Sequence, residues 1–443
     1  MADLSKVGPF GLNGLTATAA SRKLESGEIT SEALVSDCLL RIKERNTDVN
    51  AWAFIDPERA LEQARAIDKI PRRSLLHGVP IGIKDVFDTP DMPTGHGFKP
   101  YKGKMWHAES KCVSLLRDAG LLIFGKTITT EFACPQPIGT MNPHNFERTA
   151  SVSSSGSAAA VADYMVTLAN GTQTGGSVIG PAASNGVYGF KASLDGIDRT
   201  GFRHCKPSID TIGLFARSID DLILLRSINT GQKRAAHLDV EIRPRIAIVR
   251  TASWSDAERC VQNALNYTIS VLEKAGAYLE DVQLPRRFDD LINDFSVVNA
   301  WEGRRALAME VKNNFSEFNG YNRERIRFSD SLSEKEFLRS SSLLNSARAK
   351  MDKLASNFDL FLTPSLPGEA PIGTTELRTP VYTRLWTQMY MPAINLPLFE
   401  GPNNMPVNVQ LVGRNNFDAQ VLLLAKWIDD RLRESVQRLP IRL

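Results

Sequence analysis

The spacing of hydrophobic and polar positions changes along the chain, and these changes mark its elements. Residues 15–70 have a helical pattern: SEALVSDCLLRIKER follows Ile29-Thr30, and Asp56-Pro57-Glu58 supplies the cap, proline and acidic first turn that begin a helix. Beyond them, GVPIGIKDVFDT is a short apolar, β-branched run bounded by Pro and Gly. This pattern predicts a buried strand that leads into a loop.

Helical and strand-like segments alternate through the rest of the chain. The helix SKCVSLLRDAG and the strand LLIFG precede a long irregular stretch, TITTEFACPQPIGTMNPHNFERTA. After the serine-rich SVSSSGS come a predicted helix, AAAVADYM, and a strand, MVTLAN. The strands RIAIVR and AYLEDVQL flank an amphipathic helix with Val261, Leu265, Ile269 and Leu272 on one face, which predicts a β-α-β unit. FDLFLTPSL and MPVNVQLVG have the pattern of strands, and FDAQVLLLAKWIDDRL that of a closing helix.

This alternation is typical of the α/β class, with a large, mostly buried sheet covered by helices on both faces. We find no repeat, no low-complexity linker and no domain boundary in the sequence. A single domain over residues 1–443 is therefore expected. Within it we distinguish an N-terminal helical wrap (about 1–70), a core (about 75–225) and covering helices (about 286–357).

Charge, cysteine content and the lengths of apolar runs exclude several classes of protein. The 53 basic and 50 acidic residues are interspersed and give a net charge of +3, so no nucleic-acid partner is expected. The five cysteines form no C-x-x-C motif, which indicates neither a disulfide framework nor a zinc site. The first residues lack the pattern of a signal peptide, and no apolar run approaches about 20 residues. We expect a cytoplasmic protein with no membrane partner.

Three features carry candidate chemistry, and each alone has an ordinary structural interpretation. Lys84 follows an apolar strand, where a lysine is most often solvated, but a desolvated lysine has a lowered pKa and can act as a base. Ser153 lies in a serine cluster that could simply cap a helix. Ser177 ends GTQTGGS, a turn whose backbone N–H groups could converge on an oxyanion. Phosphate-loop and G-x-S-x-G motifs are absent, and no histidine lies near these residues in sequence.

Together these features resemble the amidase signature family. The resemblance is carried by GVPIGIKD, the GKT-x-x-x-EFA pattern, NPHN, SSSGSAAAVA, GTQTGGSVIGPAA and DTIGLFARSIDDL, and it resumes at FDLFLTPSLP and MPVNVQLVGR. It covers most of the chain, and it implies one α/β domain with a mixed sheet and a Ser-Ser-Lys triad. Lys84 matches the base of the triad, Ser153 the bridging serine and Ser177, 24 residues later, the nucleophile.

The resemblance implies an amidase that cleaves a small-molecule amide to an acid and ammonia or an amine through a seryl acyl-enzyme. The backbone N–H groups of Thr174, Gly175, Gly176 and Ser177 match the oxyanion hole, and neither metal nor cofactor is required. The remaining serines of the cluster are expected to cap and line the following helix. A homodimer is left open.

Two departures from the family bear on substrate and activity. Where the family has two glycines before the bridging serine, this chain has Ser151 and Val152, and Val152 precedes a bond that is cis in the family. Gly180 replaces an arginine that clamps a substrate carboxylate in similar amidases, which predicts a neutral or apolar acyl group. With Val152 and Gly180, four further residues are expected to line the substrate pocket: Tyr382, Arg384, Trp386 and Met389.

The sequence leaves other functions open. The same acyl-enzyme could pass its acyl group to an amine or hydroxyl in a biosynthetic reaction. A glutamine-hydrolysing subunit of a tRNA-dependent amidotransferase resembles this fold, although the uncharged residues around Gly180 argue against it. A catalytically weakened binding protein on the same fold is the alternative that Val152 suggests.

Overall fold

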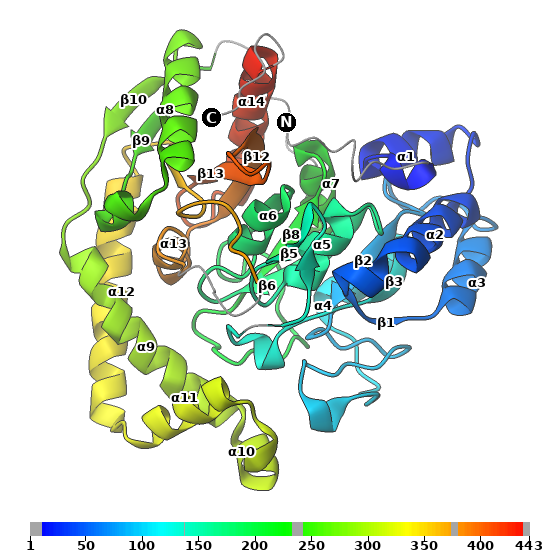
Figure 1. Ribbon diagram of the computed structural model, residues 1–443, viewed down its shortest axis with the longest axis horizontal. Coiled ribbons are helices and arrows are strands. Elements are labelled where there is room, and N and C mark those ends of the chain that lie inside the picture. Colours follow the sequence, from blue (N-terminus) through cyan, green and yellow to red (C-terminus); the bar gives the residue numbers. More distant parts are fainter. Residues whose placement is uncertain (1–10, 137, 233–241, 374–379, 437–443) are drawn as a thin grey trace.

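The computed structural model describes residues 11–136, 138–232, 242–373 and 380–436. Within them one mixed sheet runs through the molecule (Figure 1). Its strands are β1 (Trp52–Ile55), β2 (Pro80–Lys84), β3 (Leu122–Thr127), β6 (Leu168–Gln173), β7 (Tyr188–Lys191), β8 (Thr211–Ala216), β9 (Arg245–Ile248), β10 (Tyr278–Asp281), β11 (Leu360–Pro364), β12 (Ala393–Glu400) and β13 (Pro406–Val412). Their order is β1-β3-β2-β6-β8-β7-β12-β13-β11-β9-β10. Parallel pairs join β3, β2 and β6 at one end and β11, β9 and β10 at the other, with antiparallel pairs between them.

Helices cover both faces of the sheet, which confirms the predicted α/β class. In β6, Leu168 belongs to an apolar cluster with residues of α4, α7, α8 and α14, whereas its neighbour Ala169 belongs to a second cluster with α2, α3 and α5. The helices are α1 (Ala17–Glu25), α2 (Ser31–Val49), α3 (Pro57–Ile67), α4 (Lys111–Asp118), α5 (Ser155–Ala162), α6 (Ile179–Asn185), α7 (Ile219–Thr230), α8 (Arg259–Lys274), α9 (Arg287–Ala306), α10 (Ala308–Asn314), α11 (Gly320–Asp330), α12 (Glu334–Ala355), α13 (Arg384–Gln388) and α14 (Asp418–Val436).

Local sequence signals account for several of these elements. The Asp56 side chain caps α3 by accepting a hydrogen bond from the Arg59 N–H, and Pro57 is the first helical residue, as predicted. The expected β-α-β unit is also present, because β9 and β10 pair in parallel on either side of α8. Helices α9 to α12 occupy most of the segment predicted to cover the fold and lie along one side of the molecule (Figure 1).

The N-terminal segment differs from the prediction. Residues 15–70 are not wholly helical, because β1 lies between α2 and α3 and pairs antiparallel with β3 at the edge of the sheet. Asn50 ends α2 in the left-handed conformation (φ 52°), and Trp52 then packs edge-on against Phe124 at 5.5 Å between ring centroids. Residues 1–10 of the expected wrap lie outside the described residues.

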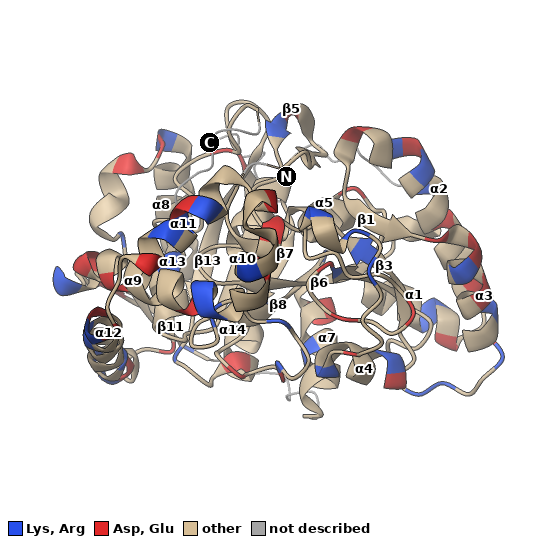
Figure 2. Cartoon of the chain, turned by 90° about the horizontal axis from the view of Figure 1, so that it is seen from below, with Lys and Arg blue, Asp and Glu red and all other residues tan. Residues whose placement is uncertain are grey.

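Besides β1, five strands were not predicted: β7, β8, β12, and the two strands of a small hairpin, β4 (Met141–Asn142) and β5 (Asn145–Thr149). The hairpin lies in the stretch expected to be irregular. Basic and acidic residues are interspersed along the outer helices (Figure 2). No helix in the described part of the chain has both the length and the apolar content needed to cross a bilayer.

Candidate active site

Lys84 ends the buried central strand β2, and its side chain is surrounded by hydroxyl groups. The side chain is fully buried. Its Nζ lies 2.9 Å from Ser153 Oγ, 2.9 Å from Ser154 Oγ and 2.8 Å from Thr172 Oγ1. The backbone N–H of Lys84 donates to Asn170 Oδ1 at 2.8 Å, which ties the strand end to β6. The sheet thus fixes both the backbone and the side chain of this lysine.

This environment favours the uncharged form of Lys84. Burial lowers the pKa of Lys84 well below its usual value; the negative charge of Asp210 opposes this shift, and the positive charge of Lys206 adds to it. No carboxylate of a described residue forms an ion pair with Lys84. A neutral amine has two N–H donors and one lone pair, which matches its three hydroxyl neighbours. The lysine is therefore placed to accept a proton.

The serines before and within α5 have distinct surroundings. The Ser153 hydroxyl has Lys84 as its hydrogen-bond partner among the described residues. Ser154, expected to cap the helix, makes no capping bond. Its Oγ donates to Thr172 O at 3.2 Å and accepts from Thr172 N at 3.3 Å, besides its contact with Lys84. Ser157 pairs with Thr127 at 2.6 Å.

Ser177 lies on a loop of residues 174–178 between β6 and α6, here called the glycine loop. Gln173 spans this loop, because its Oε1 accepts from the N–H groups of Val178 at 2.8 Å and Ile179 at 3.0 Å. The N–H groups of residues 174–177 donate to no described residue. Four neighbouring free donors form a concavity of the type that binds an oxyanion. Ser177 Oγ, on a side chain only 7% exposed, makes no hydrogen bond with the described residues.

Further contacts hold the glycine loop from two sides. On one side, the Thr174 hydroxyl donates to Asp210, whose carboxylate also accepts from the N–H groups of Cys205 at 2.9 Å and Lys206 at 2.8 Å. On the other, α13 packs so closely that a Cβ on Gly176 would lie 2.6 Å from Thr383 Oγ1. A side chain at position 176 would force Thr383 and Pro380, which precede α13, to shift, so the packing favours glycine there.

Comparison with known proteins identifies the family of this chain. A family model described as Amidase matches residues 33–422 of the chain. The chain belongs to the amidase family.

Individual relatives share the length of this chain. A glutamyl-tRNA(Gln) amidotransferase subunit of Chloroflexus aggregans is 31% identical over an alignment of 470 positions that covers 93% of this chain and 95% of that protein. The 2-amino-5-chloromuconic acid deaminase of Comamonas testosteroni is 25% identical over 94% of this chain and 96% of that protein. A crystal structure of an amidase superposes with a TM-score of 0.86 at 28% identity, over 94% of this chain and 100% of that one.

The departures from the amidase family are structurally linked. Ser151, not Val152, carries the strained backbone: its φ is +82°, in the region that favours glycine, and glycine is the residue usual in the family at this position. No described peptide bond is cis, including the bond that enters Ser153. A Cβ on Gly180 would lie 3.3 Å from Ser151 Oγ, which is a tight contact. The hydroxyl of Ser151 thus occupies space next to Gly180.

The segment expected to line the acyl pocket is mostly buried in the core. Trp386 packs on Phe361 at 5.5 Å between centroids and belongs, with Met389, to the apolar cluster under α9 and α12. Tyr382 donates to Ser253 O at 2.5 Å, and the Arg384 guanidinium lies 5.6 Å from the ring of Phe295. The role of these four residues as pocket lining stays a prediction.

Other side chains of the same segment do contact the glycine loop. Thr387 Oγ1 accepts from Gln173 Nε2 at 2.8 Å and lies 3.3 Å from Gly175 O. Sequence reasoning missed Thr387, together with Ser154 and Thr172. Because Ser153 and Ser154 are adjacent, the sequence could have suggested that both reach Lys84. No sequence pattern around Thr387 indicates that it contacts Gln173, 214 residues away.

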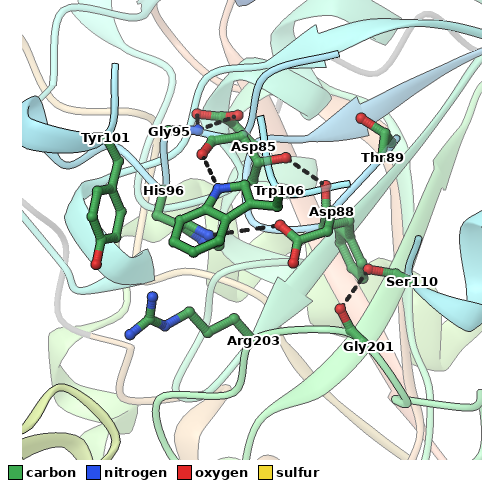
Figure 3. A network of polar contacts seen from close by, with 12 residues as sticks. Asp85, Asp88, Thr89, Gly95, His96, Tyr101, Trp106, Ser110, Gly201 and Arg203 are labelled. Carbon is green, nitrogen blue, oxygen red and sulfur yellow. Dashed lines mark hydrogen bonds and ion pairs between the residues drawn. The ribbon is translucent and has the colours of Figure 1, made fainter. Parts of the chain in front are cut away.

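A second polar network follows Lys84 directly and supports the loop after β2 (Figure 3). The Asp85 carboxylate accepts from the Gly95 N–H at 3.0 Å and lies 3.9 Å from Lys126 Nζ. Burial raises the pKa of Asp85 to about 6, although the positive charge of Lys126 opposes the shift. His96 stands 3.8 Å from Asp88, and burial lowers the pKa of His96 well below its usual value. These contacts fix the backbone that leaves the catalytic strand.

The contacts of Gln173 predict a measurable loss of stability when they are removed. Gln173→Ala leaves the Val178 and Ile179 N–H groups unsatisfied, so we expect the free energy of unfolding to fall by about 2–4 kcal/mol. Thr387→Val removes the acceptor of Gln173 Nε2 and the hydroxyl that lies against Gly175 O but leaves both bonds to Gln173 Oε1 in place, so it should cost less, about 1 kcal/mol. Urea unfolding followed by circular dichroism measures both. Losses of equal size would show that Gln173 does not hold the loop through its carbonyl oxygen.

Proposed function

We propose that this amidase-family protein hydrolyses a small carboxylic amide to an acid and ammonia or an amine through an acyl-enzyme on Ser177. The observation that carries the proposal is the buried Lys84, which is in hydrogen-bond contact with Ser153 and lies on the strand next to the one that leads into the glycine loop. Burial lowers the pKa of this lysine, which favours its role as a base. Family membership supports hydrolysis of a carbon–nitrogen bond but leaves the substrate unnamed.

In the proposed reaction, Ser177 attacks the amide carbonyl while its proton passes to Ser153 and the Ser153 proton passes to Lys84. The free N–H groups of the glycine loop hold the negative oxygen; one such donor contributes about 3–4 kcal/mol in comparable sites. Lys84 then returns the proton through Ser153 to the departing amine as the carbon–nitrogen bond breaks. Water repeats the steps on the ester and releases the acid.

Ser153 is a better bridge than Ser154, although both lie 2.9 Å from Lys84. The hydroxyl of Ser154 donates to Thr172 O, so its proton is engaged elsewhere. The hydroxyl of Ser153 has no second partner among the described residues. The relay requires the Ser177 hydroxyl to turn toward Ser153, a hydrogen bond that catalytic sites often form only with substrate bound.

Acyl transfer uses the same intermediate, with an amine or hydroxyl in place of water. The amidotransferase subunit from Chloroflexus aggregans shows that relatives of this length belong to larger assemblies. A homodimer and a cytoplasmic location remain predictions. The remaining alternative is a catalytically weakened binding protein on the same fold. Covalent labelling of the nucleophile distinguishes this alternative from hydrolysis and from acyl transfer.

Covalent labelling tests the nucleophile. A fluorophosphonate should add to the wild-type protein once, detected as a mass increase of the intact chain, because the triad activates one serine. Ser177→Ala should take up no label. Ser114→Ala, which changes a serine of α4, should be labelled like the wild type. An unlabelled wild type would favour the non-catalytic alternative.

The pH profile tests the base. Only uncharged Lys84 accepts a proton, so kcat/KM should rise with pH through the lowered pKa of Lys84 and stay level above it. Activity is therefore expected at neutral pH, where an ordinary lysine is protonated. Lys84→Met should lower kcat by at least about 1000-fold with an unchanged far-ultraviolet spectrum. The exposed control Lys102→Met should have no effect; turnover retained in Lys84→Met would remove this lysine from the mechanism.

The acyl preference is proposed from Gly180, which offers no guanidinium to a short substrate acid. An aryl amide with a neutral acyl group should therefore have a higher kcat/KM than a malonamate-type acid amide. Competition between the two substrates measures the ratio directly. Preference for the acid amide would contradict the proposal.

A further inference from the structure

Two cations outside the proposed triad converge on one sulfur atom. Lys206, in the loop between β7 and β8, is 2% exposed, and its Nζ donates to Cys134 Sγ at 3.4 Å. Arg325 of α11 donates from Nη1 to the same sulfur at 3.0 Å. Its Nη2 donates to Asn299 O and Oδ1. A buried lysine, a buried cysteine and a half-buried arginine from three distant segments thus form one cluster.

The positive charge of this cluster is not balanced by the groups around it. Neither Lys206 nor Arg325 forms an ion pair with a carboxylate of a described residue. The sulfur of Cys134 can carry at most one negative charge, so at least one positive charge stays uncompensated. A buried charge without a counter-charge costs several kcal/mol.

The two nearby carboxylates are committed to other donors. Asp210 accepts from the backbone N–H of Lys206 and from Thr174, not from the lysine side chain. Glu131 accepts from the backbone N–H of Asn319 at 3.2 Å and from Asn322 Nδ2 at 2.6 Å. Among the described residues, no carboxylate oxygen therefore accepts a hydrogen bond from the Lys206 ammonium or the Arg325 guanidinium, although the negative charge of Asp210 acts on Lys206.

A small cavity of about 20 Å³ opens at the cluster. It is lined by both cations, Cys134 and Asn322. This volume admits a group about the size of one water molecule, such as one oxygen of a carboxylate. Beside Lys206 lies Gly303 of α9, where even an added Cβ would stay 3.8 Å from the lysine side chain.

The cluster lies next to the proposed reaction centre. The backbone of Lys206 shares the Asp210 carboxylate with Thr174 of the glycine loop. The positive charge of Lys206 also contributes to the lowered pKa of Lys84. Asp210 thus links the cluster to the glycine loop that carries Ser177.

We propose that Lys206 and Arg325 bind a carboxylate carried by the amine half of the substrate, a proposal that rests on the proposed amidase function. The acyl half is assigned to the Gly180 side, because glycine at this position supplies no guanidinium. Amides of amino acids or of aminobenzoates, with a neutral acyl group, are the substrate class. Ammonium and guanidinium groups together match the geometry and charge of a carboxylate.

Binding of the product amine tests the subsite without turnover. Calorimetry should show that 4-aminobenzoate binds the wild type about 10–100-fold more tightly than aniline, the range expected of charge-assisted hydrogen bonds. Lys206→Met and Arg325→Met should each remove most of this difference, and the exposed control Lys102→Met should keep it. Equal binding of the two amines by the wild type would overturn the proposal.

Turnover separates the subsite from the proposed function. Wild-type kcat/KM should be about 10–100-fold higher for 4-acetamidobenzoate than for acetanilide. Arg325→Met, which keeps the charge of Lys206 that lowers the Lys84 pKa, should remove most of this preference by lowering kcat/KM for 4-acetamidobenzoate more than for acetanilide. Equal losses on both substrates, or preference for the acyl-side acid N-phenylsuccinamate, would overturn the proposal. If 4-aminobenzoate binds as expected but no amide is cleaved, the subsite stands and the proposed function fails.

The melting temperature of Lys206→Met tests the proposal even if this variant binds or folds poorly. Since Lys206→Met removes an unbalanced buried charge, its melting temperature should equal or exceed that of the wild type. A clear drop would show that the charge is balanced within the protein, which would overturn the proposal. Lys206→Gln then repeats the binding measurement with a polar side chain.

Discussion

The structure depends on the burial of one lysine among hydroxyl groups. Placing a protonated Lys84 at the centre of a mixed sheet, with no carboxylate beside it, would cost more than the surrounding hydrogen bonds return. The sheet therefore keeps the amine in its basic form, and the residues around it follow from this constraint. Ser153, Ser154 and Thr172 supply hydroxyls that hold the amine, and Ser153 is the bridge of the proposed relay.

The glycine loop is held by residues that come from distant parts of the chain. Gln173 fixes the start of α6 and is itself anchored on Thr387, while Thr174 is anchored on Asp210. The backbone N–H groups of such a loop stay available to a substrate only when the loop is too rigid to fold so that its own acceptors bind them. Rigid support from α13 and from the loop before β8 is thus what turns a glycine-rich turn into a candidate oxyanion hole.

Much of the fold and the centre of the candidate site could be predicted from the sequence. The distant residues that hold the site in place could not. The β9-α8-β10 unit and the cap at Asp56 were predicted because their signals are local. The edge strand β1 was missed, because its pairing with β3 decides its conformation and no local pattern reports that pairing. The contact between Gln173 and Thr387 joins residues more than 200 positions apart, and no local sequence pattern indicates such a contact.

The contact between Ser151 and position 180 has a consequence for how such a site can evolve. A side chain at position 180 would press on the Ser151 hydroxyl, and Ser151 already holds a backbone conformation that suits glycine. The two positions are therefore not independent. Glycine at position 151 would remove this contact, so the side chain that position 180 accommodates, and with it the acyl group that the site favours, depends on both positions together.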